Sequence, residues 1–263
     1  MAKRILVIPD VHGRTFWKEP VSKHMDDVDK VVFLGDYLDP YPHEGVEYTA
    51  TSLLDNLMEI IDLKRHHAEK VVLLKGNHDQ HYASEKFYKL ACGSRYDDVN
   101  RDTFHEVFSN YSEYFKIAHL EEVNEIPYLF SHAGLTLYWI HEVNSHIWKM
   151  ADNLVSIADQ EIVEKINALD DCGEGQEMLA IVGRKRSWFG EKSGSVLWAD
   201  VGEHAIPDAP EAYGLNKVFQ VFGHTRLDGG TEDLFEFDNF AMIDSQKCFM
   251  IDESANERIV PVR

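Results

Sequence analysis

The sequence predicts an α/β fold in which parallel strands alternate with helices. Three short apolar runs rich in β-branched residues, at 5–8, 31–34 and 71–74, have the character of strands buried on both faces. Between the second and third runs, apolar residues recur at steps of three and four over 53–61, which predicts a helix. Successive strand–helix–strand units are most simply parallel, so these observations favour a parallel sheet covered by helices.

Further strands are predicted in the second half of the chain, at 128–130, 218–222, 240–243 and 248–251. The last two runs flank the turn-like residues 244–247, so they are predicted to pair as a hairpin. This C-terminal part is therefore expected to form a second, more antiparallel sheet.

The segment at about 135–182 is predicted to be mainly helical. Its apolar residues fall largely on one helical face, and these are Leu154, Ile157, Ala158, Ile162 and Ile166. A loop rich in Arg, Lys, Ser and Gly follows at 183–194. Because no stretch resembles an interdomain linker, the chain is predicted to be a single domain over residues 1–263, with the helical segment as an insertion.

Composition limits the classes of partner. The chain has 46 acidic and 26 basic residues and a formal net charge of −20, which would repel polyanions. Non-specific binding to nucleic acid or to an anionic membrane is therefore disfavoured. No stretch reaches the roughly 20 apolar residues that span a bilayer. The three cysteines have no paired metal-ligand spacing, which favours a reducing compartment, and the protein is predicted to be cytoplasmic.

Five predicted strands end in side chains that can bind metal, each beside a glycine. These side chains are Asp10 and His12 after the first strand, Asp36 after the second, Asn77 after the third, and His132 and His224 after two later strands. In open α/β sheets, ligands bind at the carboxyl ends of strands. Each motif alone also fits a turn or a helix cap, but all five in this order make coincidence improbable. The sequence therefore predicts one metal site.

The ligand types indicate which metals bind. Asp10 and His12 are two residues apart, so in extended backbone their side chains share one face. A carboxylate such as that of Asp36 can bridge two cations. Imidazole favours Mn, Fe, Zn or Ni over Mg or Ca, and the lack of sulfur ligands indicates a hydrolytic site rather than a closed structural zinc. Two divalent metal ions are therefore predicted.

These motifs resemble the calcineurin-like metallophosphoesterase superfamily. The sequences at 35–39, 196–200 and 223–225 look closest to its protein-phosphatase and diadenosine-tetraphosphatase branch. The resemblance implies a four-layer α/β/β/α sandwich of two mixed β-sheets flanked by helices. It also implies the distribution of ligands: Asp10, His12 and Asp36 at the first metal, and Asp36, Asn77, His132 and His224 at the second.

The resemblance further implies a reaction. A metal-bridging hydroxide would attack, in line, a phosphomonoester or a nucleotide polyphosphate. His78 would donate a proton to the leaving oxygen, and Asp39 would orient its ring. The expected partner is accordingly a small phosphorylated substrate or a nucleotide.

One position departs from the branch. Its protein phosphatases carry an arginine directly after the second aspartate of Gly-Asp-x-x-Asp, where this chain has Pro40. Arginine offers a fork of donors to phosphate oxygens and proline offers none, which counts against a phosphoprotein substrate without excluding it. Arg14 and Arg226 are the candidate replacements, with Arg184 and Arg186 as further ones.

Two alternatives remain open at this stage. Adjacent His78 and Asp79 also fit an HD-type phosphohydrolase, but that class is all-helical and a predicted strand immediately precedes Gly76. A non-enzymatic binding scaffold on the same fold is the other alternative. The six filled ligand positions favour an enzyme over a scaffold.

Overall fold

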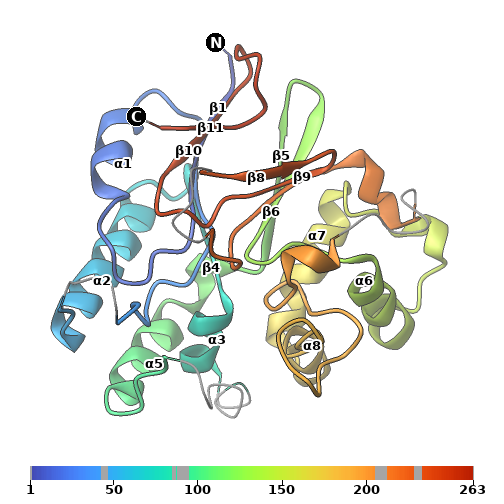
Figure 1. The fold of residues 1–263 in the computed structure, drawn as a ribbon, viewed down its shortest axis with the longest axis horizontal. Coiled ribbons are helices and arrows are strands. Elements are labelled where there is room, and N and C mark those ends of the chain that lie inside the picture. Colours follow the sequence, from blue (N-terminus) through green and yellow to red (C-terminus); the bar gives the residue numbers. More distant parts are fainter. Residues whose placement is uncertain are drawn as a thin grey trace. The chain divides into compact units, whose positions relative to one another are not determined.

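The computed structural model describes residues 2–42, 47–84, 87, 95–204, 212–227 and 233–262. The chain divides into two compact units: unit 1, Met1–Lys116 with Gln246–Arg263, and unit 2, Ile117–Ser245. Among the described residues each unit contains one β-sheet, and helices flank both sheets (Figure 1). The α/β fold with two mixed sheets flanked by helices is thus confirmed. The single domain with an insertion stays a prediction.

The sheet of unit 1 has the strand order β11–β10–β1–β2–β3–β4. Its strands are β1 (Arg4–Ile8), β2 (Lys30–Phe33), β3 (Val71–Leu74), β4 (Phe115–Lys116), β10 (Phe249–Asp252) and β11 (Val260–Pro261). The strands from β1 to β4 are mutually parallel, as predicted for the first three, whereas β10 is antiparallel to both of its neighbours. The parallel strands place their carboxyl ends at one edge of the sheet.

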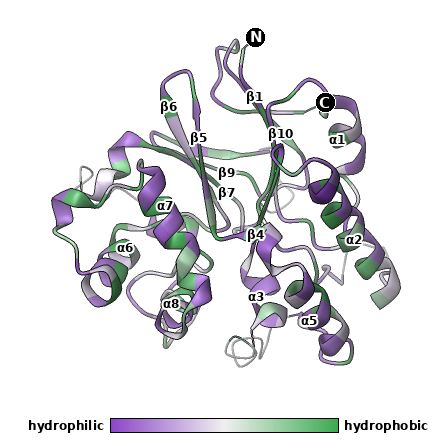
Figure 2. Ribbon diagram, turned by 180° about the vertical axis from the view of Figure 1, so that it is seen from behind, coloured by the Kyte–Doolittle hydropathy of each residue, from purple (hydrophilic) through white to green (hydrophobic). Residues whose placement is uncertain are grey.

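Four α-helices belong to unit 1 in the described ranges. They are α1 (Lys18–His24), α2 (Ala50–His66), α3 (Asn77–Ala83) and α5 (Arg101–Asn110), with a 3₁₀ turn at Ser112–Tyr114. The predicted helix is α2, which begins with a reciprocal cap between Thr49 and Ser52 and carries hydrophilic and hydrophobic residues side by side (Figure 2). It buries Leu57, Ile60 and Ile61 against the core.

The sheet of unit 2 has the order β5–β6–β7–β9–β8. Its strands are β5 (Ala118–Val123), β6 (Ile126–Ser131), β7 (Phe219–Phe222), β8 (Phe235–Phe237) and β9 (Phe240–Met242). The inner pairs β6–β7 and β7–β9 are parallel, and the outer pairs are antiparallel. Parallel β6 and β7 therefore end at the same edge of this sheet.

The segment predicted to be helical holds three α-helices of unit 2: α6 (Leu137–Val143), α7 (Gln160–Asn167) and α8 (Gly173–Leu179). Within the same segment, shorter helical turns lie at Asn144–Trp148, Asp152–Leu154 and Ala168–Asp171. Two more follow it in unit 2, at Val201–Glu203 and Ala212–Lys217. Across the described ranges, no helix has both the length and the apolar character needed to cross a membrane.

The predicted hairpin between the last two runs is wrong. Strand β9 lies between β7 and β8 in unit 2, whereas β10 lies between β1 and β11 in unit 1. The turn-like residues 244–247 carry the chain from one sheet to the other, and Gln246 adopts a left-handed conformation there (φ 59°). Both runs are apolar at nearly every position, and such a run indicates burial without specifying a partner strand.

The continuous helical face predicted from Leu154 to Ile166 is also wrong in its first half. Leu154 is 63% exposed, and α7 begins only at Gln160, where the Asp159 side chain accepts a hydrogen bond from the Glu161 N–H at 2.9 Å. Asp159 is the N-cap of α7, and aspartate is among the residues preferred at this position. The second half is correct, because α7 buries Ile166.

Candidate metal site

The loops after β1 and β2 are joined by backbone hydrogen bonds. Val11 N–H donates to Gly35 C=O at 3.3 Å, and His12 N–H donates to Asp36 C=O at 2.6 Å. These bonds extend the pairing of the strands into their loops. As a result, Asp10, His12 and Asp36, all buried, each offer one ligand atom within 4.8 Å of the others. This trio is the Asp–His–Asp cluster.

The His12 side chain is set up as a neutral ligand. Its Nδ1 lies 2.9 Å from the Leu38 carbonyl oxygen, so Nδ1–H donates and Nε2 keeps its lone pair. That Nε2 lies 3.5 Å from Asp36 Oδ2. Burial lowers the pKa of His12 well below its usual value, against the opposing charge of Asp36. A neutral imidazole with a free Nε2 is the form that binds a divalent cation.

Several of the predicted site residues have left-handed backbone. The φ angles are 45° at His12, 52° at Asp36, 59° at Asp39 and 65° at His224. The extended backbone expected for Asp-x-His is therefore wrong at His12, and a turn brings the two side chains together instead. Each such residue costs about 1–2 kcal/mol, and strain of this kind concentrates at functional sites.

Asp79 ties the strand-end loops of unit 1 together. Its carboxylate is completely buried and accepts hydrogen bonds from Asp36 N–H at 2.7 Å, Tyr37 N–H at 2.9 Å and Gly76 N–H at 2.7 Å. The loops meet so closely that a Cβ on Gly76 would lie 2.0 Å from Asp36 Oδ1, which requires glycine. Burial and the charge of Asp36 raise the pKa of Asp79, and the three N–H donors oppose this. Sequence reasoning considered Asp79 only for the HD-type alternative and missed this role.

Asn77 and His78 begin helix α3 beside the Asp–His–Asp cluster. Asn77 is buried, and His78 N–H donates to Asp36 Oδ1 at 3.0 Å. The His78 Nδ1 lies 2.7 Å from Asp39 Oδ2, so the predicted contact between these two side chains is present. The hydroxyl of Tyr82 donates to the other oxygen of Asp39 and holds the carboxylate in place.

The surroundings favour a charged His78 ring. Burial lowers the pKa of His78, but the charge of Asp36 and the hydrogen bond to Asp39 outweigh burial, so that the pKa rises above its usual value. The neighbouring His81 behaves oppositely, since burial and the charge of His78 lower its pKa to about 3. Asp39, His78 and His81 also bring one potential ligand atom each within 4.8 Å of one another.

In unit 2, the parallel strands β6 and β7 bring His132 and His224 together. Gly223 N–H donates to His132 C=O at 2.8 Å, which links the two strand ends. His132 Nε2 lies 3.1 Å from His224 Nδ1. Two imidazole nitrogens that share one cation at about 2.1 Å are separated by roughly 3.0–3.4 Å, so this pair fits a metal.

The predicted phosphate arginines differ in their surroundings. Arg14 is buried, and its Nη1 donates to the Asp10 carbonyl oxygen at 3.2 Å. Arg186 donates to Thr225 Oγ1 at 2.5 Å and pairs with Asp200 at 3.2 Å, which commits its charge to a carboxylate. Arg184 is exposed in the loop, whereas Arg226 is half-buried just after Thr225.

A cation that sequence reasoning missed lies beside the Asp–His–Asp cluster. Arg95 donates through Nε to the Asp39 carbonyl oxygen at 2.9 Å, and its Nη2 lies 3.4 Å from His12 Nε2. Its guanidinium carbon is 3.6 Å from the centre of the Tyr41 ring. No motif surrounds Arg95 in the sequence, so no pattern could have identified it.

The aromatic residues near the metal motifs are mainly structural. The Tyr37 hydroxyl donates to the Leu74 carbonyl oxygen at 2.9 Å and Tyr82 supports Asp39, and both rings are buried. Tyr41 is half-buried against His12 and Arg95. His43, which the sequence also places near these motifs, lies outside the described residues, as does Cys92.

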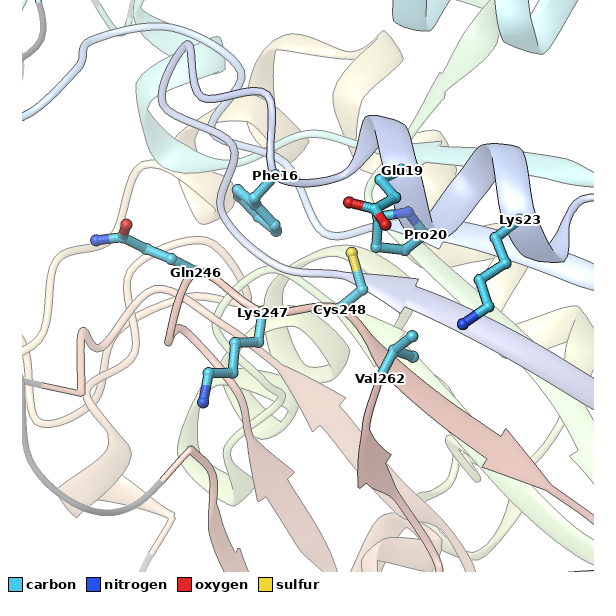
Figure 3. A pocket seen from close by; sticks show the side chains of 8 residues that line it. All are labelled: Phe16, Glu19, Pro20, Lys23, Gln246, Lys247, Cys248 and Val262. Carbon is cyan, nitrogen blue, oxygen red and sulfur yellow. The ribbon is translucent and has the colours of Figure 1, made fainter.

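A separate cavity of about 220 Å³ lies in unit 1 and is lined by none of the predicted metal ligands. Figure 3 shows its lining side chains, which come from the region of α1, from the residues that precede β10, and from Val262. It includes the thiol of Cys248, whose pKa burial raises to about 12. The thiol therefore stays protonated and unreactive at neutral pH.

Comparisons with known proteins give the family and the fold of the chain. A family model described as calcineurin-like phosphoesterase matches residues 3–225. No curated protein sequence matches the chain. A serine/threonine phosphatase from Saccharomyces cerevisiae, with similarity to human phosphatase PP5, has a similar structure, with a TM-score of 0.54, 15% identity, and coverage of 99% of this chain and 79% of that one. An archaeal phosphodiesterase matches with a TM-score of 0.34 and 11% identity, covering 98% of this chain and 99% of that one. At these identities the yeast structure shows a shared fold.

Proposed function

Because the chain belongs to the calcineurin-like phosphoesterase family, we propose that it hydrolyses a phosphomonoester or a nucleotide polyphosphate with two divalent metal ions. The observation that carries the proposal is the buried Asp–His–Asp cluster, in which the hydrogen bond from His12 Nδ1 to Leu38 leaves the lone pair on Nε2, 3.5 Å from Asp36 Oδ2. Buried carboxylates this close together repel one another unless a cation is bound. The cluster therefore has the chemistry of a metal site.

The proposed ligands are distributed as the family resemblance implies. One metal would be held by Asp10, His12 and Asp36, and the other by Asp36, Asn77, His132 and His224. This mixture of imidazole, carboxylate and amide suits Mn, Fe, Zn or Ni. When bound, the metals supply a water of lowered pKa and positive charge next to the phosphate.

The protein's own groups supply the proton for the leaving oxygen. Asp39 fixes the Nδ1–H of His78, so the proton available to a substrate is the one on Nε2. The hydrogen bond to Asp39 and its negative charge raise the pKa of His78 and so favour the ring that carries this proton. A positioned acid of this kind contributes about 10²–10⁴-fold to the rate.

His78→Asn is expected to lower turnover by at least about tenfold while metal content is unchanged. The loss should be larger for an alkyl phosphate, whose leaving oxygen needs a proton, than for p-nitrophenyl phosphate. The exposed His66→Asn is the matched control. Steady-state kinetics and elemental analysis of the dialysed proteins measure both quantities. Near-normal turnover of the alkyl phosphate would refute this role for His78.

One screen tests the proposed function. The purified protein is loaded with Mn²⁺, Zn²⁺, Ni²⁺ or Fe²⁺ and assayed with phosphomonoesters, phosphodiesters, dinucleoside polyphosphates and phosphopeptides. We expect hydrolysis of monoesters or nucleotides that chelation abolishes. The two sheets exclude the all-helical HD-type alternative. The binding scaffold predicts no metal-dependent hydrolysis with any substrate, and that result would replace the proposal.

The proposal also includes a cytoplasmic location. It is supported by Cys172 and Cys248, which are free thiols. Thiols persist in the reducing cytoplasm, whereas oxidising compartments favour disulfides.

A further inference from the structure

We propose that Arg95 binds the substrate phosphate beside the Asp–His–Asp cluster, supplying the cation that the motif lacks at Pro40. This inference rests on the proposed function, because it names a substrate-binding residue for the same site. It concerns a residue that lies outside every metal motif of the sequence.

The position of Arg95 is fixed by three contacts. Its Nε–H donates to the carbonyl oxygen of Asp39, which belongs to the peptide bond between Asp39 and Pro40. Its guanidinium carbon lies 3.6 Å from the centre of the Tyr41 ring. Its Nη2 lies 3.4 Å and 3.5 Å from the two ring nitrogens of His12, and such similar distances place it against the ring face. Arg95 thus contacts Asp39 and Tyr41, the two residues that flank Pro40, although it lies far from them in the sequence.

These contacts leave donors for a ligand. Stacking on Tyr41 occupies one face of the guanidinium, the hydrogen bond to Asp39 uses Nε–H, and Nη2 approaches the His12 ring, which is nearly perpendicular to Tyr41. Both N–H groups of Nη1 and the second N–H group of Nη2 lie in the guanidinium plane, where a fork of donors matches two phosphate oxygens. Within the described parts of the chain, Arg95 forms no ion pair with a carboxylate.

Two of the other arginines considered are less suited. Arg14 already donates through Nη1 to the backbone at Asp10, and its side chain is buried. The charge of Arg186 is paired with Asp200. Arg95, in contrast, is only partly buried, so its free donors can meet a ligand that enters from solvent.

A cation in contact with a metal-binding histidine has a chemical consequence. Arg95 contacts the His12 ring, and Arg14 donates to the Asp10 carbonyl oxygen, so both positive charges lie at the Asp–His–Asp cluster. With divalent cations also bound, the cluster would attract an anion. A phosphoryl group would bring its negative oxygens to the metals and to the guanidinium together.

The test measures binding of inorganic phosphate, the reaction product, to the manganese-loaded protein by isothermal titration calorimetry. The variants are Arg95→Ala and Arg95→Lys, with Arg65→Ala as the control. Arg65 lies on the exposed face of α2, where it pairs with Asp62. Its replacement by alanine makes the same change in net charge as Arg95→Ala. The manganese content of each loaded variant and the thermal unfolding of each variant without metal are measured in parallel.

We expect Arg95→Ala to weaken phosphate binding by about 10–100-fold, with unchanged manganese content. Arg95→Lys should recover only part of this loss, because an ammonium group lacks the fork. KM for the phosphate ester that the protein hydrolyses should be lowest in wild type, higher in Arg95→Lys and highest in Arg95→Ala. Arg65→Ala should behave as wild type.

Two results would overturn the inference alone while wild-type hydrolysis stands. One is unchanged phosphate affinity in Arg95→Ala. The other is loss of manganese or of thermal stability that accounts for the weaker binding, because Arg95 would then only support the loop around Asp39. If the loaded wild-type protein neither hydrolyses phosphate esters nor binds phosphate, the proposed function fails and this inference fails with it.

Discussion

Asp36→Asn is expected to abolish metal-dependent hydrolysis while leaving the metal-free protein at least as stable as wild type. Asparagine keeps an oxygen for the His78 N–H, and its amide can donate to His12 Nε2, which lies 3.5 Å from Asp36 Oδ2. The substitution also removes a negative charge that raises the pKa of buried Asp79, and so relieves repulsion between the two carboxylates. Metal binding, in contrast, loses a negatively charged ligand.

The measurement separates the two effects. Urea unfolding is followed with chelator and with manganese at about 100 times its dissociation constant, where bound metal should stabilise wild type by about 2.7 kcal/mol. We expect no such gain in Asp36→Asn, and a fall in turnover of at least about a hundredfold. Asp102→Asn, at an exposed side chain, is the control. A variant that keeps its metal and its activity would exclude Asp36 as a ligand.

Asp79→Ala is expected to destabilise the metal-free protein by about 3–5 kcal/mol. The change leaves three buried backbone N–H groups, at Asp36, Tyr37 and Gly76, without their acceptor, and each unsatisfied group costs about 1–3 kcal/mol. The alanine variant no longer buries the charge of Asp79, and this offsets part of the cost of the three unsatisfied N–H groups. Asp79→Asn should cost less, since its one amide oxygen can still accept from two of the three donors.

Chemical unfolding in chelator isolates this effect from metal loss. The control is Asp29→Ala, because Asp29 also accepts a backbone N–H, from Arg4 at 2.8 Å, but on the exposed surface where water can replace it. Its cost should stay within about 1 kcal/mol. Equal losses for the two aspartates would show that Asp79 does not join the loops.

The strand ends could be predicted because two physical rules act on the same residues. A strand buried on both faces needs an unbroken apolar run, as in β1, β2 and β3, and the chain must then turn sharply. The polar residue at that turn, such as Asp10 or Asp36, stands out against the run before it. The predicted strands and their carboxyl ends therefore agree with the structure.

Other features have no local signal. The separate positions of β9 and β10 depend on pairing with distant strands, which an apolar run does not encode. Arg95 reaches His12 through tertiary folding alone, so neither spacing nor composition indicates it. The left-handed backbone at His12 likewise accompanies a hydrogen bond to the neighbouring loop, a tertiary contact that no local pattern encodes.

The place of β10 beside β1 has a consequence for the growing polypeptide. At about 5–20 residues per second, a ribosome needs roughly 10–50 s to proceed from Ile8 to Phe249. During that interval β1 lacks the neighbour that covers one of its edges, and its apolar residues can pair with other nascent chains. This edge of β1 therefore stays open to such pairing until β10 has been synthesised and has docked.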